Sequence, residues 1–174
     1  MKNVPNILTV MRMIMVPFFV VLFFSVSHSA ALIIFLVAFI TDIADGFIAR
    51  KYNAVTDLGK VLDPLADKFM KLTALCCLAL KNIIPVWIFL AMLTLDLMLI
   101  FPSAILYKRK FVVSSNIVGK AGTLFITVAI LLCFVGTNGL NMVFLYAGLT
   151  TVLVSMIVYA LNYLSKIRQT EKTL

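Results

Sequence analysis

The sequence predicts an all-α, polytopic membrane protein with six transmembrane helices, both termini in the cytoplasm, and one domain over residues 1–174. Three observations support this fold class. The chain is 63% hydrophobic and 13% charged, whereas soluble domains are about 45–50% apolar and about 25% charged. Apolar runs near the length that crosses a bilayer recur along the chain, and basic residues gather on alternate connections.

The expected spans are interrupted by residues that end or begin helices. Residues 25–29 form a polar turn after the first apolar run, and residues 51–56 link the second run to the third. Lys81 and Asn82 end the third run, and Pro85 can begin the fourth at its first turn. A charged loop at 108–110 and a Gly-containing turn at 136–139 separate the last three. The predicted spans are residues 7–26, 30–50, 61–80, 84–107, 117–135 and 140–164.

The distribution of Lys and Arg predicts the orientation. With the N-terminus inside, fourteen of the 15 basic residues fall on the cytoplasmic side and only Lys81 falls outside. Cytoplasmic connections are enriched in Lys and Arg. The net charge of +8 therefore indicates an anionic membrane surface as the partner. No basic–aromatic pattern indicates nucleic acid.

Acidic residues are concentrated where the second and third spans approach the cytoplasm. We call Asp42, Asp45, Asp63 and Asp67 the carboxylate cluster. Each Asp at the centre of a membrane helix costs about 2.5–3.5 kcal/mol, so a group of them calls for a function. Spacings of three and four residues put each pair on one helix face. Adjacent antiparallel helices can thus direct all of them into one pocket.

The residue types in and around this cluster indicate phosphate chemistry. Carboxylates bind Mg²⁺ or Mn²⁺, and two such ions can clamp the oxygens of a phosphoryl displacement. Gly46 and Gly59 allow a ligand to approach the backbone closely, and Arg50 supplies a planar cation suited to phosphate. These residues therefore predict a phosphate-rich substrate at the cytoplasmic face of the membrane.

The stretch reads DxxDGxxAR, eight residues, then GxxxDxxxD, and it resembles the signature of the CDP-alcohol phosphatidyltransferase family. The chain has the signature residue at every fixed position of the family's pattern: Asp42, Asp45, Gly46, Ala49, Arg50, Gly59, Asp63 and Asp67. The length and the six-span layout extend the likeness over nearly the whole chain.

The resemblance implies transfer of a phosphatidyl group from CDP-diacylglycerol to an alcohol, with release of CMP. Two metal ions, Mg²⁺ or Mn²⁺, would be bound by Asp42, Asp45 and Asp63, and Asp67 would contact the second ion or act as the base. The implied CDP-lipid site comprises Asp42, Gly46, Ala49, Arg50 and Gly59. A homodimer in the cytoplasmic membrane, with its active site facing the cytoplasm, is also implied.

Two short stretches bear on the acceptor. Residues 4–12 and 48–60 resemble phosphatidylglycerophosphate synthases, which implies glycerol 3-phosphate as the acceptor, with Arg109 and Lys120 as its best phosphate ligands. Residues 96–100 instead resemble cardiolipin synthases, for which phosphatidylglycerol is the acceptor. Both resemblances lack the Arg expected before Asp96, where this chain has Leu95.

Some residues carry alternative interpretations. A divalent-cation carrier could use the same carboxylates, although it would leave the glycines and Arg50 without a role. Asp57 is interpreted as a helix cap or first-turn charge. Arg12 either snorkels to the interface or lines the pocket, and Lys68 and Lys71 snorkel or balance the carboxylate cluster.

Overall fold

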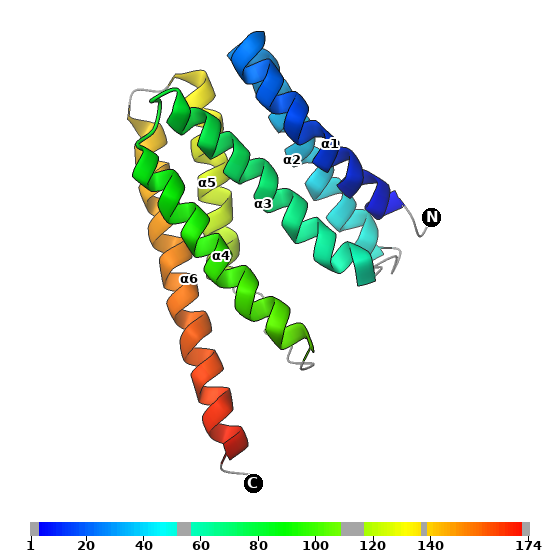
Figure 1. Cartoon of the computed structure of the whole chain (residues 1–174), viewed down its shortest axis with the longest axis vertical. Coiled ribbons are helices and arrows are strands. Elements are labelled where there is room, and N and C mark those ends of the chain that lie inside the picture. The colour runs from blue at the N-terminus through cyan, green and yellow to red at the C-terminus, as the bar shows by residue number, and fades with distance from the viewer. Residues whose placement is uncertain (1–3, 52–56, 109–116, 137–138, 172–174) are drawn as a thin grey trace. The chain divides into compact units, whose positions relative to one another are not determined.

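The structure is a computed structural model that describes residues 4–51, 57–108, 117–136 and 139–171, with side chains over 9–44, 66–98, 118–136 and 139–161. Helices account for nearly all of these residues, and no strand occurs among them (Figure 1). Their bounds are α1 Val4–Ser25, α2 His28–Lys51, α3 Asp57–Leu80, α4 Val86–Lys108, α5 Ile117–Val135 and α6 Leu140–Glu171.

The predicted helices are confirmed, and the main differences lie at their ends. Helix α3 begins at Asp57, four residues before its predicted start, which agrees with a first-turn charge at that position. Helix α6 continues to Glu171 through a polar segment. Hydropathy marks the apolar part of a helix, whereas helical hydrogen bonding can continue into a polar segment.

Two helices are long and apolar enough to cross a membrane within the part described with side chains. They are Val118–Val135 and Leu140–Leu161, and the latter's 22 residues span about 33 Å at the helical rise. Shorter apolar stretches cover Thr9–Ser25, His28–Ala44 and Val86–Met98, each continuing into helix whose side chains are not described. Six spans and cytoplasmic termini stay predictions.

Residue contacts divide the chain into two compact units, Met1–Ile84 and Pro85–Leu174. In the first unit, α1 packs against both α2 and α3, and α2 also touches α3. In the second unit, α6 packs against both α5 and α4. The prediction of a single domain over 1–174 stays a prediction.

The turn between α1 and α2 is held by a side-chain cap. The backbone N–H of Ala30 donates to Oγ of Ser27 at 3.1 Å, which satisfies one of the free donors at the start of α2. Deeper in the hairpin, the rings of Phe19 and Phe35 approach to 6.2 Å. These residues each lie eight positions from Ser27, so the two helices run antiparallel without an offset.

Helix α3 buries residues at four-residue intervals in its middle and on most sides near its C-terminal end, and it ends in a left-handed cap. Its buried side chains include Ala66, Met70 and Ala74, which recur every four residues. Asn82 has φ 57°, and the N–H of Ile83 donates to the carbonyl of Leu78, as in a Schellman motif.

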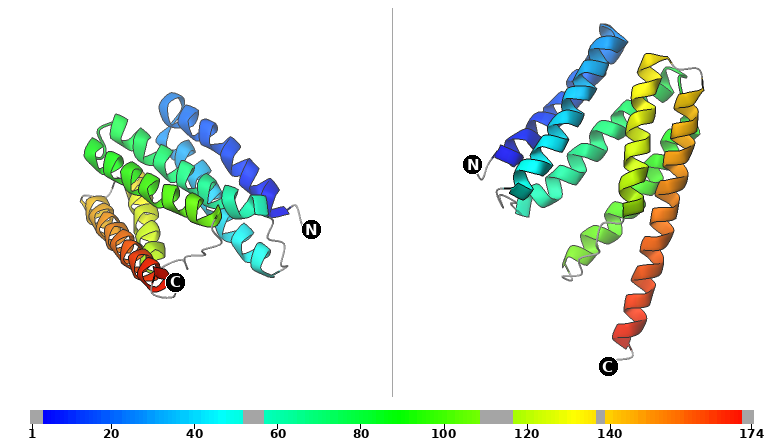
Figure 2. Two further views of the ribbon diagram at one scale, coloured as in Figure 1. Left: turned by 60° about the horizontal axis from the view of Figure 1, so that its bottom comes forward. Right: turned by 180° about the vertical axis from the view of Figure 1, so that it is seen from behind.

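Glycines let α5 and α6 approach closely (Figure 2). A Cβ on Gly148 would lie 2.6 Å from Cδ1 and 3.1 Å from the backbone N of Ile126. Equivalent close contacts are Gly122 with Val152 and Gly119 with Ser155. Each step forward along α5 is matched by an equal step back along α6, so one antiparallel register explains all of these contacts. Small residues permit such backbone approach in membrane helices.

The outer faces of both units carry large apolar side chains. Phe18, Ile33 and Ile40 in the first unit are 59–61% exposed, and Val143 and Leu161 in the second are similarly exposed. Exposed apolar surface of this extent is typical of a protein surrounded by lipid or by a partner.

We expect Gly148→Ala to lower the melting temperature in detergent, with a loss of about 1–3 kcal/mol in the free energy of unfolding. The added Cβ would press on the Ile126 backbone, which cannot move as a side chain can. The measurement is thermal unfolding followed by circular dichroism.

The matched control is the same change in an Ile126→Ala background, where the two nearest atoms are removed. Gly148→Ala should then cost less, because the two sites are coupled. An unchanged or raised melting temperature for the single variant would contradict this packing.

Candidate active site

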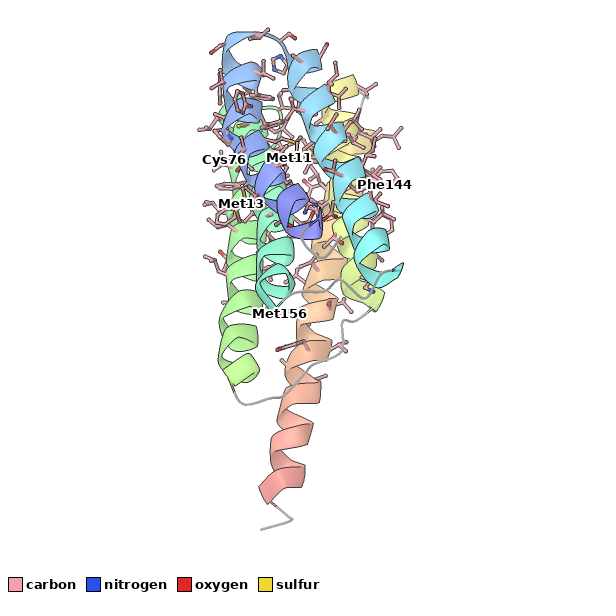
Figure 3. All side chains as sticks on the ribbon, turned by 90° about the vertical axis from the view of Figure 1, so that its right-hand side faces the viewer. Met11, Met13, Cys76, Phe144 and Met156 are labelled. Atoms are coloured by element: carbon pink, nitrogen blue, oxygen red, sulfur yellow. The ribbon has the colours of Figure 1, made fainter. Side chains whose placement is uncertain are left out.

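The antiparallel hairpin places Arg12 of α1 opposite Asp42 of α2. Both residues lie fifteen positions from Ser27, in the register that also brings Phe19 to Phe35. Nη1 of Arg12 lies 2.7 Å from Oδ1 of Asp42. Figure 3 marks this part of α1 by the neighbouring side chains Met11 and Met13.

The Arg12 side chain is buried, and the Asp42 side chain is at the edge of the packed region. Their exposed fractions are 1% and 33%. Thr9, one turn before Arg12 on the same face of α1, is also fully buried. Arg12 therefore does not snorkel to the interface. It points into the helix packing, where a charge needs an opposite charge or hydrogen bonds.

On α3, Asp67 pairs with Lys71 one turn later. Nζ of Lys71 donates to Oδ2 of Asp67 at 2.7 Å, and the side chains are 15% and 28% exposed. Both residues flank the face that packs through Ala66, Met70 and Ala74. Lys71 thus balances the acid directly, as one of the two sequence-based interpretations expected.

The other cluster members lie in the same helices, but their side chains are outside the described part. Asp45 follows Asp42 by one turn in α2, and Asp63 precedes Asp67 by one turn in α3. Residues three or four apart share a helix face, so the backbone keeps each pair together. Among the side chains that the structure describes, no three potential metal ligands gather.

The predicted nucleotide-lipid residues lie in the same two helices. Gly46, Ala49 and Arg50 are in the last turns of α2, and Gly59 is in the first turn of α3. The side chains of these residues lie outside the described part of the structure.

The predicted acceptor residues belong to the second unit. Lys120 is exposed in the first turn of α5, and Arg109 lies outside the described residues. Asp96 is partly buried in α4. The use of Arg109 and Lys120 in acceptor binding stays a prediction.

Sequence reasoning did not include Arg12 among the site residues. A single Arg inside the first apolar run is ambiguous by hydropathy alone. The available signal was its equal distance with Asp42 from the polar turn at Ser27, which predicts contact once the helices are known to form a hairpin without offset.

The chain belongs to the CDP-alcohol phosphatidyltransferase family, and it is therefore an enzyme of that class. The sequence model of this family matches residues 2–159, which cover nearly all of the first compact unit and most of the second. Members of this family are membrane-associated and generally depend on a divalent cation. Family membership favours the enzyme interpretation over the cation carrier.

The chain is similar to proteins named CDP-diacylglycerol–glycerol-3-phosphate 3-phosphatidyltransferase. It is 37% identical to one from Aquifex aeolicus over 132 residues, which cover 74% of each chain. It is 33% identical to one from Bacillus subtilis over 138 residues, covering 71% of this chain and 72% of the relative. Identity to the Escherichia coli K12 protein is 48% over 71 residues, covering 39% of each chain.

The donor groups fit a hard divalent cation. Asp42 and Asp67 offer carboxylate oxygens, which are the ligands that Mg²⁺ and Mn²⁺ prefer. Asp42 forms an ion pair with Arg12 through one of its oxygens, and Asp67 accepts a hydrogen bond from Lys71 through one of its own. A carboxylate has two oxygens and about four lone-pair sites, so such a pair is compatible with metal ligation.

We expect Asp42→Asn to lower the free energy of unfolding by about 1–3 kcal/mol, between the values for exposed and buried ion pairs. The neutral amide would remove the Asp42 negative charge that lies 2.7 Å from the buried Arg12 guanidinium. Thermal unfolding in detergent without added metal measures the loss.

Asp67→Asn is the matched control, because its pair with Lys71 is more accessible, and it should cost less than about 1 kcal/mol. Asp42→Asn combined with Arg12→Gln should cost less than the sum of the two single variants. Equal losses for both Asp variants, or strict additivity, would contradict a specific Arg12–Asp42 interaction.

Proposed function

We propose that the protein transfers the phosphatidyl group of CDP-diacylglycerol to glycerol 3-phosphate and releases CMP. The observation that carries the proposal is the similarity to the Aquifex and Bacillus proteins, whose names state this reaction and whose alignments extend over about three quarters of the chain. The carboxylate cluster agrees with it.

The reaction is a displacement at the phosphorus that bears the lipid. The acceptor hydroxyl oxygen forms a bond to this phosphorus, and the bond to the oxygen shared with the cytidine phosphate breaks. The electron pair of the broken bond leaves with CMP, and the hydroxyl proton passes to a base. In this proposal the base is Asp67. A general base must lie within hydrogen-bond reach of the proton it takes, so the acceptor hydroxyl would bind next to this carboxylate.

The carboxylate cluster would hold Mg²⁺ or Mn²⁺, two ions in all. Bound there, the ions would neutralise the pyrophosphate and stabilise the leaving group. Asp42, Asp45 and Asp63 serve as ligands, and Asp67 combines a ligand role with that of the base. Lys71 then orients the Asp67 carboxylate through the bond at its Oδ2.

Residues near the carboxylate cluster would bind the nucleotide and the acceptor. Gly46, Ala49 and Gly59 leave room for cytidine, because none has a side chain beyond Cβ, and Arg50 binds phosphate. Arg109 and Lys120 bind the phosphate of glycerol 3-phosphate. The enzyme works in the cytoplasmic membrane as a six-span homodimer with this site on the cytoplasmic side.

The purified protein in detergent should release CMP from CDP-diacylglycerol when glycerol 3-phosphate and Mg²⁺ or Mn²⁺ are present. Asp67→Asn should lower the rate by about 10²–10⁴-fold, because it removes the base. Lys81→Gln is the control, since Lys81 is exposed beyond the end of α3 and should leave the rate unchanged. CMP release is followed by chromatography.

Supplying phosphatidylglycerol in place of glycerol 3-phosphate tests the cardiolipin synthase alternative in the same assay. If lipid product forms with phosphatidylglycerol and not with glycerol 3-phosphate, phosphatidylglycerol is the acceptor and the proposed acceptor is wrong. Absence of CMP with either acceptor, or a wild-type rate for Asp67→Asn, would contradict the proposed mechanism.

A further inference from the structure

Two basic side chains lie against the acids of the carboxylate cluster, and the proposed reaction needs neither for bond making. Arg12 reaches Asp42 from another helix at 2.7 Å, and Lys71 reaches Asp67 from the next turn at 2.7 Å. A site whose only task was to collect divalent cations would gain from leaving such positive charges out, because they repel the metal.

The charge of Arg12 is fixed in place. A guanidinium keeps its charge in proteins. Its side chain is 1% exposed, so dissolved salt screens it poorly, and the hairpin register holds α1 against α2 at this level. Asp42, at 33% exposure, faces the accessible side of the same pair.

Formal charges show what the two cations do to the site. The carboxylate cluster carries four negative charges, which two divalent ions alone would cancel completely. With Arg12 and Lys71 included, the same two ions leave an excess of two positive charges. A nucleotide pyrophosphate esterified at both ends brings two negative charges, which offset this excess, and Arg50 adds one further positive charge at the proposed phosphate site.

We propose that Arg12, assisted by Lys71, keeps the metal site weakly occupied until the CDP-lipid is bound. The two cations repel a metal ion and so weaken its binding to the empty site, and they attract the pyrophosphate, which in turn binds the metal. This inference rests on the proposed function, because it takes the carboxylate cluster as the metal site. Arg12 acts through Asp42 and is a positioning residue.

A purely supporting role for Arg12 predicts the opposite sign. Losing a group that only orients a metal ligand typically weakens metal binding by about 10–100-fold. Losing a nearby positive charge instead strengthens metal binding. The gain is about tenfold for one unit charge, if the effective dielectric constant lies between that of a protein surface and that of water. The direction of the change therefore distinguishes the two roles.

The experiment is a Mn²⁺ titration of the detergent-solubilised protein by electron paramagnetic resonance, with and without CDP-diacylglycerol. The ratio of the two dissociation constants is the coupling factor, and it equals the factor by which Mn²⁺ changes the affinity for the lipid. Arg12→Gln should bind Mn²⁺ about tenfold more tightly without the lipid, and it should bind CDP-diacylglycerol more weakly without the metal.

Further variants make the test independent of one buried site. Lys71→Gln should shift both affinities in the same direction, Arg12→Lys should keep both close to the wild-type values, and Lys81→Gln should match the wild type. Lys81 is a matched loss of charge, ten residues beyond Lys71. Thermal unfolding shows which variants are folded. If Arg12→Gln does not fold, the Mn²⁺ affinity of Lys71→Gln tests the inference instead.

The outcomes separate this inference from the proposed function. Wild-type protein that binds no Mn²⁺ and releases no CMP overturns both. Wild-type protein that binds Mn²⁺ and releases CMP, with weaker or unchanged Mn²⁺ binding in the folded Arg12 and Lys71 variants, overturns the inference alone.

Discussion

The first compact unit depends on the register of the α1–α2 hairpin. Because the two helices run antiparallel from Ser27 without an offset, the Arg of the first apolar run meets the first Asp of the carboxylate cluster. Neither group is favourable alone among apolar side chains, and each supplies what the other needs. A shift of one residue along either helix would turn them to different faces, since each residue advances a helix by about 100°.

Helix α1 also connects the two halves of the carboxylate cluster. It packs against α2, which carries Asp42 and Asp45, and against α3, which carries Asp63 and Asp67. The second unit uses a different means of fixing register, with glycines on α5 and α6 meeting larger residues of the partner helix. In one unit a charge pair sets the alignment, and in the other backbone contact does.

Much of the fold could be predicted because apolar runs and their polar interruptions are local features of the sequence. The Asp67–Lys71 pair could also be predicted from the sequence, since four-residue spacing places both residues on one helix face. The depth and direction of Arg12 were not, because they depend on tertiary packing and hairpin register. The ends of α3 and α6 differed because polar first and last turns are helical without being hydrophobic. Arg109 lies outside the described residues, so its predicted role stays a prediction.

The central claim is that Asp42 can serve a metal ion while Arg12 holds it. The most direct measurement is an experimental structure of the protein with Mn²⁺ and CDP-diacylglycerol, in which anomalous scattering locates the metal. We expect Mn²⁺ at coordination distance from one Asp42 oxygen, with the Arg12 guanidinium still in its ion pair with the other. Mn²⁺ bound away from Asp42, or an Arg12 side chain that has left it, would contradict the account.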